Sequence, residues 1–185
     1  DVAGHGASSA FLTILLKSFI SRLISDERQG YNDIIFKPAA VLDYLNRQFI
    51  NLKLKKLLTM FYGILDSSQK KLLFSTGGQY PLPILSADNT AGFLVGKGLP
   101  LGIVPQAVYR QEEKTFSGRF KILCFSDGVF ELLPGEDTDK KGSLVLDLFQ
   151  NRDWGGEEWK DYLLGFSKVF PDDITLLKIE GDFSL

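Results

Sequence analysis

The spacing of the hydrophobic residues changes near residue 60 of this 185-residue chain. Before that point, residues 11–24 and 38–52 carry apolar side chains at i, i+4 spacing with polar residues between them, which predicts two amphipathic helices. Pro38 suits the first turn of the second helix. After residue 60 the apolar residues form short runs rich in β-branched and aromatic side chains, which predicts strands.

The predicted elements follow one another in the order helix, helix, several strands, helices and a final strand. The strands are expected at residues 60–65, 71–75, 82–85, 91–95, 107–116, 120–125 and 174–179, and the later helices at residues 144–149 and 157–166. A polar turn at residues 66–69 joins the first two strands and indicates a hairpin. This order favours an α+β fold over alternating βαβ units.

Three breaks rich in glycine or proline interrupt this pattern, at residues 77–78, 96–102 and 134–142. None of them separates two hydrophobic sets that could each form a core, so they are interpreted as loops. A length of 185 residues and a hydrophobic content of 44% suit one domain with a sizeable core. The sequence therefore predicts a single domain over residues 1–185.

The charge and composition exclude several classes of partner. A formal net charge of −2 provides no basic surface for nucleic acid and no polybasic signal for a membrane. Polar and charged residues, among them Lys17 and Arg22, interrupt the apolar stretches, so we expect no membrane span and no signal peptide. The single cysteine, Cys124, excludes an internal disulfide and suits a reducing compartment. We therefore expect a cytoplasmic protein without nucleic-acid or membrane partners.

Aspartate stands beside apolar runs at three widely separated places, which are Asp1, Asp127 and the pair Asp172–Asp173. Carboxylates at strand ends lie at the rim of a sheet, and adjacent glycine lets carbonyl groups or a ligand approach closely. Such acids converging from distant segments form an oxygen-rich site for magnesium or manganese, and two such ions can hold a phosphoryl group. Taken one at a time, an Asp-Gly pair is more often a turn, and an Asp-Asp pair is more often a solvated surface.

Five segments, in order along the chain, resemble the motifs of one family. They are residues 1–10 (D-V-A-G-H-G-A-S-S-A), 77–81 (G-G-Q-Y-P), 98–102 (G-L-P-L-G), 126–131 (S-D-G-V-F-E) and 172–175 (D-D-I-T). They resemble the D-V-x-G-H-G, A-G-H-x-P, G-x-P-L-G, T-D-G-v-x-E and D-D-x-T motifs of SpoIIE/RsbU-type PPM phosphatases. The resemblance implies an αββα sandwich of two antiparallel sheets flanked by helices. It also implies a metal centre at one edge that holds two divalent cations, manganese or magnesium.

The same resemblance assigns roles to single residues at the matching positions. Asp1, Asp127 and Asp172 are implied to be the catalytic metal ligands. Asp1 would bridge the two ions, and the carbonyl group of Val2 would be able to coordinate as well. Asp173 is the alternative to Asp172 as the ligand, or else supports it.

His5 and a set of glycines complete the implied site. His5 is the only histidine, and its two interpretations are a general acid and a residue with a structural or supporting role. The loop glycines are expected to be structural, and they are Gly4, Gly6, Gly77, Gly78 and Gly128.

The chain also departs from the family pattern. A further acidic motif of the family, G-G-D-x-x-D, lies upstream of the first motif, so we expect this chain to be N-terminally truncated and to lack that ligand. We therefore expect the 185 residues by themselves to bind divalent metal weakly and to show little or no phosphatase activity. Uncovered sheet edges would favour the pairing of two copies in a homodimer. Gly77, Gln79 and Ser126 replace the alanine, histidine and threonine of the motifs, at positions that shape turns.

The resemblance implies hydrolysis of a phosphoserine or phosphothreonine on a regulatory partner, such as an anti-sigma-factor antagonist. It implies the output domain of a bacterial signalling protein, with a receiver or other sensory domain preceding it. The alternative is a weakly active or inactive phosphatase-fold adaptor that binds a sigma factor or its regulator. Retention of the three aspartates favours the enzyme, because an adaptor has no need of gathered carboxylates.

Other residues of chemical interest receive structural interpretations. Cys124 lies between Leu123 and Phe125 and is expected to be a small buried strand residue. Residues 136–139 are acidic but lack the spacing of a calcium-binding loop, so a solvated loop is expected. Trp154 and Trp159 are expected to cover the sheet rather than to anchor a partner.

Overall fold

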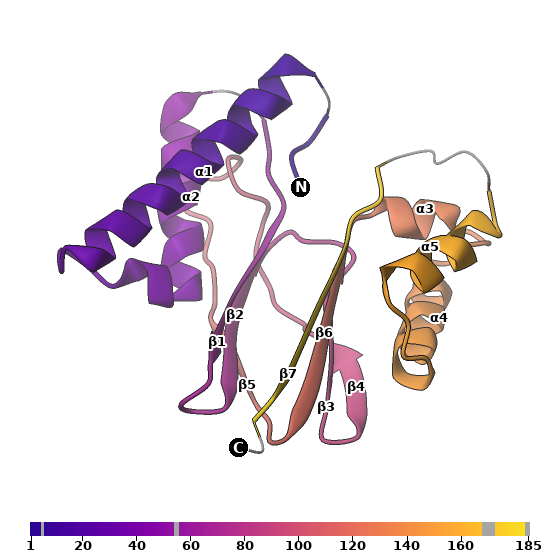
Figure 1. Cartoon of the computed structure of the whole chain (residues 1–185). Helices are drawn as coiled ribbons and strands as arrows, with labels where there is room; N and C mark the ends of the chain where they lie inside the picture. The colour runs from indigo at the N-terminus through magenta and orange to yellow at the C-terminus, as the bar shows by residue number, and fades with distance from the viewer. Residues whose placement is uncertain (5, 54–55, 168–172, 184–185) are drawn as a thin grey trace. The chain divides into compact units, whose positions relative to one another are not determined.

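The computed structural model describes residues 1–4, 6–53, 56–167 and 173–183 (Figure 1). The chain forms two compact units, of which the first holds residues 1–79 and 96–115 and the second holds residues 80–95 and 116–185. Each unit therefore combines two separate stretches of the sequence. The single-domain interpretation stays a prediction.

The first unit contains a three-stranded antiparallel sheet with the strand order β1-β2-β5. Its elements are α1 (Ala7–Arg28), the 3-10 helix η1 (Ile34–Phe36), α2 (Pro38–Leu52), β1 (Met60–Asp66), β2 (Lys71–Gly77) and β5 (Glu112–Thr115). The turn between β1 and β2 forms the predicted hairpin, in which Leu65 lies opposite Leu72.

Helix α2 has the bounds that the sequence predicts, because its start and its apolar face are both encoded locally. Pro38 begins the helix, where its missing N–H costs no hydrogen bond. Val41, Leu42 and Leu45 are each 0% exposed, and the helix packs against β1 and β2. Burial of each such side chain contributes about 1.5–3 kcal/mol, so this face anchors the helix to the sheet.

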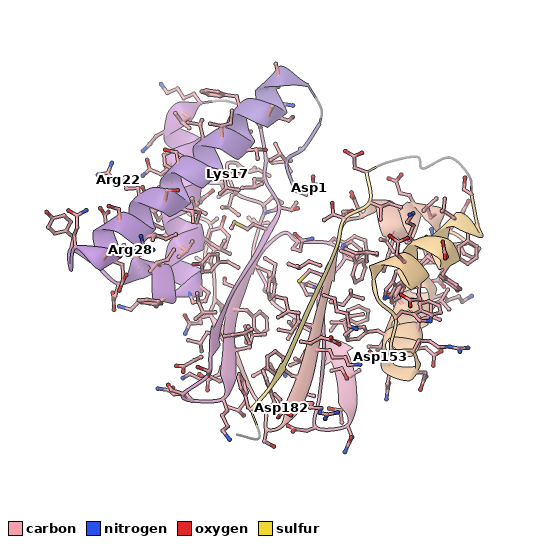
Figure 2. All side chains as sticks on the ribbon, viewed as in Figure 1. Asp1, Lys17, Arg22, Arg28, Asp153 and Asp182 are labelled. Carbon is pink, nitrogen blue, oxygen red and sulfur yellow. The ribbon has the colours of Figure 1, made fainter. Side chains whose placement is uncertain are left out.

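Helix α1 is covered less completely than its double apolar stripe predicts. Leu12 and Leu23 are buried in the core of the first unit, whereas Phe11 is exposed. By length and composition alone, α1 could cross a membrane. From the sequence we expected Lys17 and Arg22 to exclude a membrane span. Both residues lie along α1 (Figure 2), yet the length and composition of the helix still permit one. One such helix is weak evidence, because core helices of soluble proteins pass the same test.

The second unit contains a four-stranded antiparallel sheet with the strand order β4-β3-β6-β7. Its elements are β3 (Ile84–Ala87), β4 (Thr90–Phe93), β6 (Arg119–Phe125), α3 (Gly128–Leu132), α4 (Thr138–Asn151), α5 (Gly156–Leu164) and β7 (Leu176–Asp182). Within this unit the three helices lie together beside the sheet (Figure 1).

The core of the second unit joins the sheet to its helices. Ile84 and Leu123 from the strands pack in one cluster with Val129 of α3 and Trp159 of α5. Trp159 is 3% exposed, and the ring of Trp154 meets it edge-on at a centroid distance of 5.2 Å. The prediction that these tryptophans cover the sheet is confirmed.

The predicted loop at residues 134–142 is wrong in its second half, because α4 begins there at Thr138. Asp137 is the N-cap residue of this helix, and its carboxylate accepts hydrogen bonds from the backbone N–H groups of Asp139 at 3.0 Å and Lys140 at 3.2 Å. These bonds satisfy donors that the first turn leaves unpaired. Two of the acidic residues interpreted as a solvated loop therefore start a helix.

The largest difference in a strand concerns the segment expected at residues 107–116. It is shortened to β5, since residues 107–111 form no strand. Helix α3 was not predicted, because it has only five residues and follows an Asp-Gly pair that is typical of a turn.

The fold class is nevertheless confirmed. Two antiparallel sheets and several helices form an α+β protein.

We predict that Gly78→Ala will lower the free energy of unfolding by about 1–3 kcal/mol. Gly78 has a φ of +70°, and a Cβ atom there would lie 2.5 Å from Cγ and 2.9 Å from the backbone nitrogen of Pro100. Denaturant unfolding monitored by circular dichroism measures the change. Gly92→Ala is the matched control, because a Cβ atom at Gly92 meets nothing within 4 Å. Equal stability of the two variants would contradict the close approach.

Candidate active site

The end of β6 and the start of β7 bring two of the acidic motifs together in the second unit. The strands are antiparallel neighbours, with Phe125 opposite Leu176. The backbone N–H of Ser126 extends this pairing by donating to the carbonyl oxygen of Thr175 at 3.0 Å. Residues 126–128 and 173–175 therefore meet at one end of the four-stranded sheet, although they are distant in sequence.

The side chain of Ser126 adds two hydrogen bonds to this junction. Its hydroxyl donates to the backbone carbonyl oxygen of Asp173 at 3.0 Å. The same Oγ atom accepts the backbone N–H of Thr175 at 2.9 Å. One hydroxyl thus holds the backbone of the D-D-I-T motif on both sides of Ile174, directly beside Asp127.

Gly128 permits the same close approach from the next turn of the chain. A Cβ atom at Gly128 would lie only 2.5 Å from the carbonyl oxygen of Asp173. Any larger residue at this position would push the two motifs apart. The predicted structural role of Gly128 therefore has a definite cause, which is the space that the Asp173 carbonyl group occupies.

Asp127 lies between these two contacts and starts α3. One carboxylate oxygen, Oδ1, accepts the backbone N–H of Gly128 at 3.1 Å, which orients the side chain at the helix start. Asp127 is half-buried, whereas Asp173 is exposed. Val129, at the second position of α3, is 0% exposed, so the core fixes the helix and with it the Asp127 backbone.

In the first unit, the D-V-A segment is held as an extended strand-like piece. Val2 pairs antiparallel with Leu58. The N–H of Thr59 donates to the carbonyl oxygen of Asp1 at 2.8 Å, and the N–H of Ala3 donates to that of Leu57 at 3.0 Å. Asp1, labelled in Figure 2, is exposed at the start of this piece.

The following glycine-rich turn leads into α1 and encloses a lysine. Gly4 and Gly6 have φ angles of +82° and +86°, which glycine adopts without steric cost. Lys56 donates from Nζ to the carbonyl oxygen of Ala3 at 3.0 Å and to Oγ of Ser9 at 3.4 Å. A Cβ atom at Gly4 would lie 2.8 Å from this Nζ atom, whereas a Cβ atom at Gly6 would meet nothing within 4 Å, so only Gly4 leaves space for the Lys56 side chain.

The G-L-P-L-G segment is tied to the same region. The N–H of Leu58 donates to the carbonyl oxygen of Leu101 at 3.1 Å, and the N–H of Gly78 donates to the carbonyl oxygen of Gly98 at 2.8 Å. Asn46 of α2 is 0% exposed and accepts the N–H of Gly102 at 2.8 Å, while its Nδ2 donates to the carbonyl oxygen of Val104 at 2.9 Å. The G-G and G-L-P-L-G segments therefore shape turns, and Asn46 fixes the second of them.

The predicted metal ligands are distributed over both units. Asp1 and Val2 belong to the first unit and Asp127 to the second, while Asp172 and His5 lie outside the described residues. Within the described ranges, no group of three or more His, Cys, Asp or Glu side chains gathers in a way that could hold a metal ion. The assignment of the metal ligands and of the role of His5 stays a prediction.

The chemistry of the available donors fits a hard cation. The acidic motifs offer carboxylate and carbonyl oxygens, which suit magnesium and manganese. Cys124, a residue of β6 near this end of the sheet, is half-buried, and burial raises the pKa of its thiol to about 11. The thiol is therefore protonated at neutral pH, which does not favour a role as a nucleophile.

Sequence reasoning missed the residues that hold the motifs in place. Ser126 was identified only as a replacement of threonine, and Asn46 and Lys56 were not identified at all. A polar residue inside the apolar stripe of α2 was a usable signal for Asn46, because buried amides require partners. No comparable signal marked Lys56, whose contacts depend on the fold.

Solved structures share this architecture over nearly the whole chain. The RsbU and RsbW domains of Rv1364c from Mycobacterium tuberculosis match with a TM-score of 0.72 and 27% identity, covering 98% of this chain and 50% of that one. The SiaA-PP2C domain of Pseudomonas aeruginosa matches with a TM-score of 0.73 and 20% identity over 98% of this chain and 74% of that one. RsbX in complex with magnesium matches with a TM-score of 0.63 and 16% identity over 95% of this chain and 75% of that one. The fold is that of PP2C-type, or PPM, phosphatase domains.

Sequence comparison narrows this class to one family. The model of the family described as Stage II sporulation protein E (SpoIIE) matches residues 1–181. The chain therefore belongs to the SpoIIE family. It is 31% identical over 133 residues to the phosphoserine phosphatase RsbU of Bacillus subtilis. The aligned segment covers 71% of this chain and 37% of RsbU. The match thus spans 37% of RsbU and 50% of the solved chain that holds the RsbU and RsbW domains of Rv1364c.

We predict that Asn46→Ala will lower the free energy of unfolding by about 2–4 kcal/mol, because two partly buried backbone groups, the Gly102 N–H and the Val104 carbonyl, lose their partner. Denaturant unfolding measures this change. Asn51→Ala is the matched control, since Asn51 lies in the same helix and is exposed, and its effect should stay within about 0.5 kcal/mol. A similarly small effect of Asn46→Ala would show that this amide does not hold the loop.

Proposed function

We propose that this chain is the phosphatase domain of a metal-dependent protein serine/threonine phosphatase. One observation carries the proposal. This chain belongs to the SpoIIE family, and in it Ser126 and Gly128 hold the backbone of Asp173 against the turn that contains Asp127. Two acidic motifs that are far apart in sequence thus share one end of a sheet, which is what an oxygen-rich cation site requires.

The proposed ligands are Asp1, Asp127 and Asp172, with the Val2 carbonyl as a further donor and Asp173 as the alternative to Asp172. All of these groups offer oxygen atoms, and RsbX, which has the same fold, binds magnesium. We therefore propose two divalent cations, magnesium or manganese. Such a pair would supply an activated water molecule and charge neutralisation for the phosphoryl group.

The residues of this chain would position the acids that bind the cations. Asp127 is oriented by the N–H of Gly128 and by the buried start of α3, so its carboxylate is preorganised before substrate binds. The backbone that carries Asp1 is held by pairing with the segment around Leu58.

We further propose that the substrate is a phosphoserine or phosphothreonine of a regulatory protein, such as an anti-sigma-factor antagonist. The supporting observation is similarity to RsbU, a phosphoserine phosphatase. A receiver or sensory domain before this domain, a cytoplasmic location and a homodimer belong to the same proposal. The adaptor without turnover is less well supported, because this chain has aspartates at the three motif positions.

We predict that Asp127→Ala will lower the manganese-dependent hydrolysis of para-nitrophenyl phosphate by the full-length protein at least about 100-fold. Loss of a ligand removes several kcal/mol of charge stabilisation, and each 1.4 kcal/mol corresponds to a factor of ten. Initial rates are measured at matched protein and manganese concentrations.

Asp147→Ala is the control for this experiment, because Asp147 lies on α4 and accepts a hydrogen bond from Asn151 outside the site. It should hydrolyse the substrate like the wild type. Undiminished activity of Asp127→Ala, or activity of the wild type in excess chelator, would refute the metal-dependent mechanism.

A further inference from the structure

The hydrogen bonds of Ser126 extend beyond the end of the β6–β7 ladder. The ladder itself continues through the backbone N–H of Ser126, which donates to Thr175. The hydroxyl reaches one step further, to the carbonyl oxygen of Asp173 at 3.0 Å. Ser126 therefore does more than close the sheet, because its side chain fixes the backbone that connects the sheet to the acid pair.

Both hydrogen-bonding functions of the hydroxyl are used in this position. Oγ donates to Asp173 and accepts from Thr175 at 2.9 Å. A methyl group can do neither, and it would leave the Asp173 carbonyl and the Thr175 N–H without these partners. A threonine hydroxyl keeps both capacities. Position 126 therefore requires a hydroxyl group, and an apolar side chain of the same size would not make these two hydrogen bonds.

Gly128 allows the Asp173 carbonyl group to approach the backbone beside Asp127 closely. Because a Cβ atom there would lie 2.5 Å from the Asp173 oxygen, the carbonyl group sits between the Ser126 hydroxyl and the Gly128 backbone. Asp127, the residue between them, therefore keeps a fixed separation from the Asp173 backbone.

We infer that Ser126 is a positioning residue that holds the Asp173 backbone beside Asp127, so that these two acids lie close enough to share one cation. The inference rests on the proposed function, since it requires that these acids bind metal. Groups that orient metal ligands through hydrogen bonds commonly change metal affinity 10–100-fold when removed. Ser126 would act in this way without contacting the ion or the substrate.

The test compares Ser126→Thr with Ser126→Val in the full-length protein. The two side chains have the same shape and differ by the hydroxyl. Titration calorimetry with Mn²⁺ should give a dissociation constant about 10–100-fold weaker for Ser126→Val than for wild type, and Ser126→Thr should stay within about threefold of wild type. Hydrolysis of para-nitrophenyl phosphate by Ser126→Val should recover as Mn²⁺ is raised toward saturation.

Amide hydrogen exchange in the metal-free protein provides a readout that does not depend on activity. The Thr175 N–H loses its acceptor in Ser126→Val, so its exchange should become at least about tenfold faster, while that of Ser126→Thr should not change. Ser143→Ala is the matched control, because the Ser143 hydroxyl donates to Asp139 within α4. It should alter neither manganese affinity nor Thr175 exchange.

The outcomes separate this inference from the proposed function. If wild type requires and binds Mn²⁺ and Ser126→Val binds it equally well, the positioning role is wrong and the proposed function stands. If wild type binds no Mn²⁺, both are wrong. If Ser126→Val does not fold, Ser126→Ala is measured in its place, and loss of the folded state in both variants would assign the hydroxyl to the fold and overturn the positioning role.

Discussion

The candidate site depends on the antiparallel pairing of β6 with β7. This pairing sets Phe125 opposite Leu176, and the Ser126 backbone and hydroxyl extend it toward the acid pair. Helix α3 then starts at Asp127 and is fixed by the buried Val129. A slip in the register of this pair would move the D-D-I-T backbone away from Asp127 and would also turn the strand faces over.

The sequence predicted those elements whose signals are local. Helix α2 was predicted with its observed bounds because Pro38 starts it and one continuous stripe covers its buried face. Strand β6 was predicted within one residue, since a run of apolar residues fills it. Helices α3 and α4 were missed or misplaced, because Asp127 and Asp137 at their starts are also typical turn residues. Only the tertiary structure distinguishes a helix cap from a turn.

The acids of the site were identified from motifs, whereas their supports were not. The Ser126 hydroxyl has its partners in residues 173 and 175, and the Asn46 side chain bonds Gly102 and Val104. Such partners depend on strand register and helix packing, which a single sequence does not reveal. Asp1 and Asp127 belong to different compact units, so the proposal that both bind one cation pair is the claim that most needs a direct test.

A crystal structure of the full-length protein grown with Mn²⁺ tests that claim most directly, through anomalous diffraction at the manganese edge. We predict two manganese peaks near one end of the β6–β7 pair, with carboxylate oxygens of Asp1, Asp127 and Asp172 within about 2–2.3 Å. An absence of manganese at Asp127, or ions held by a set of residues that excludes both Asp1 and Asp127, would contradict it.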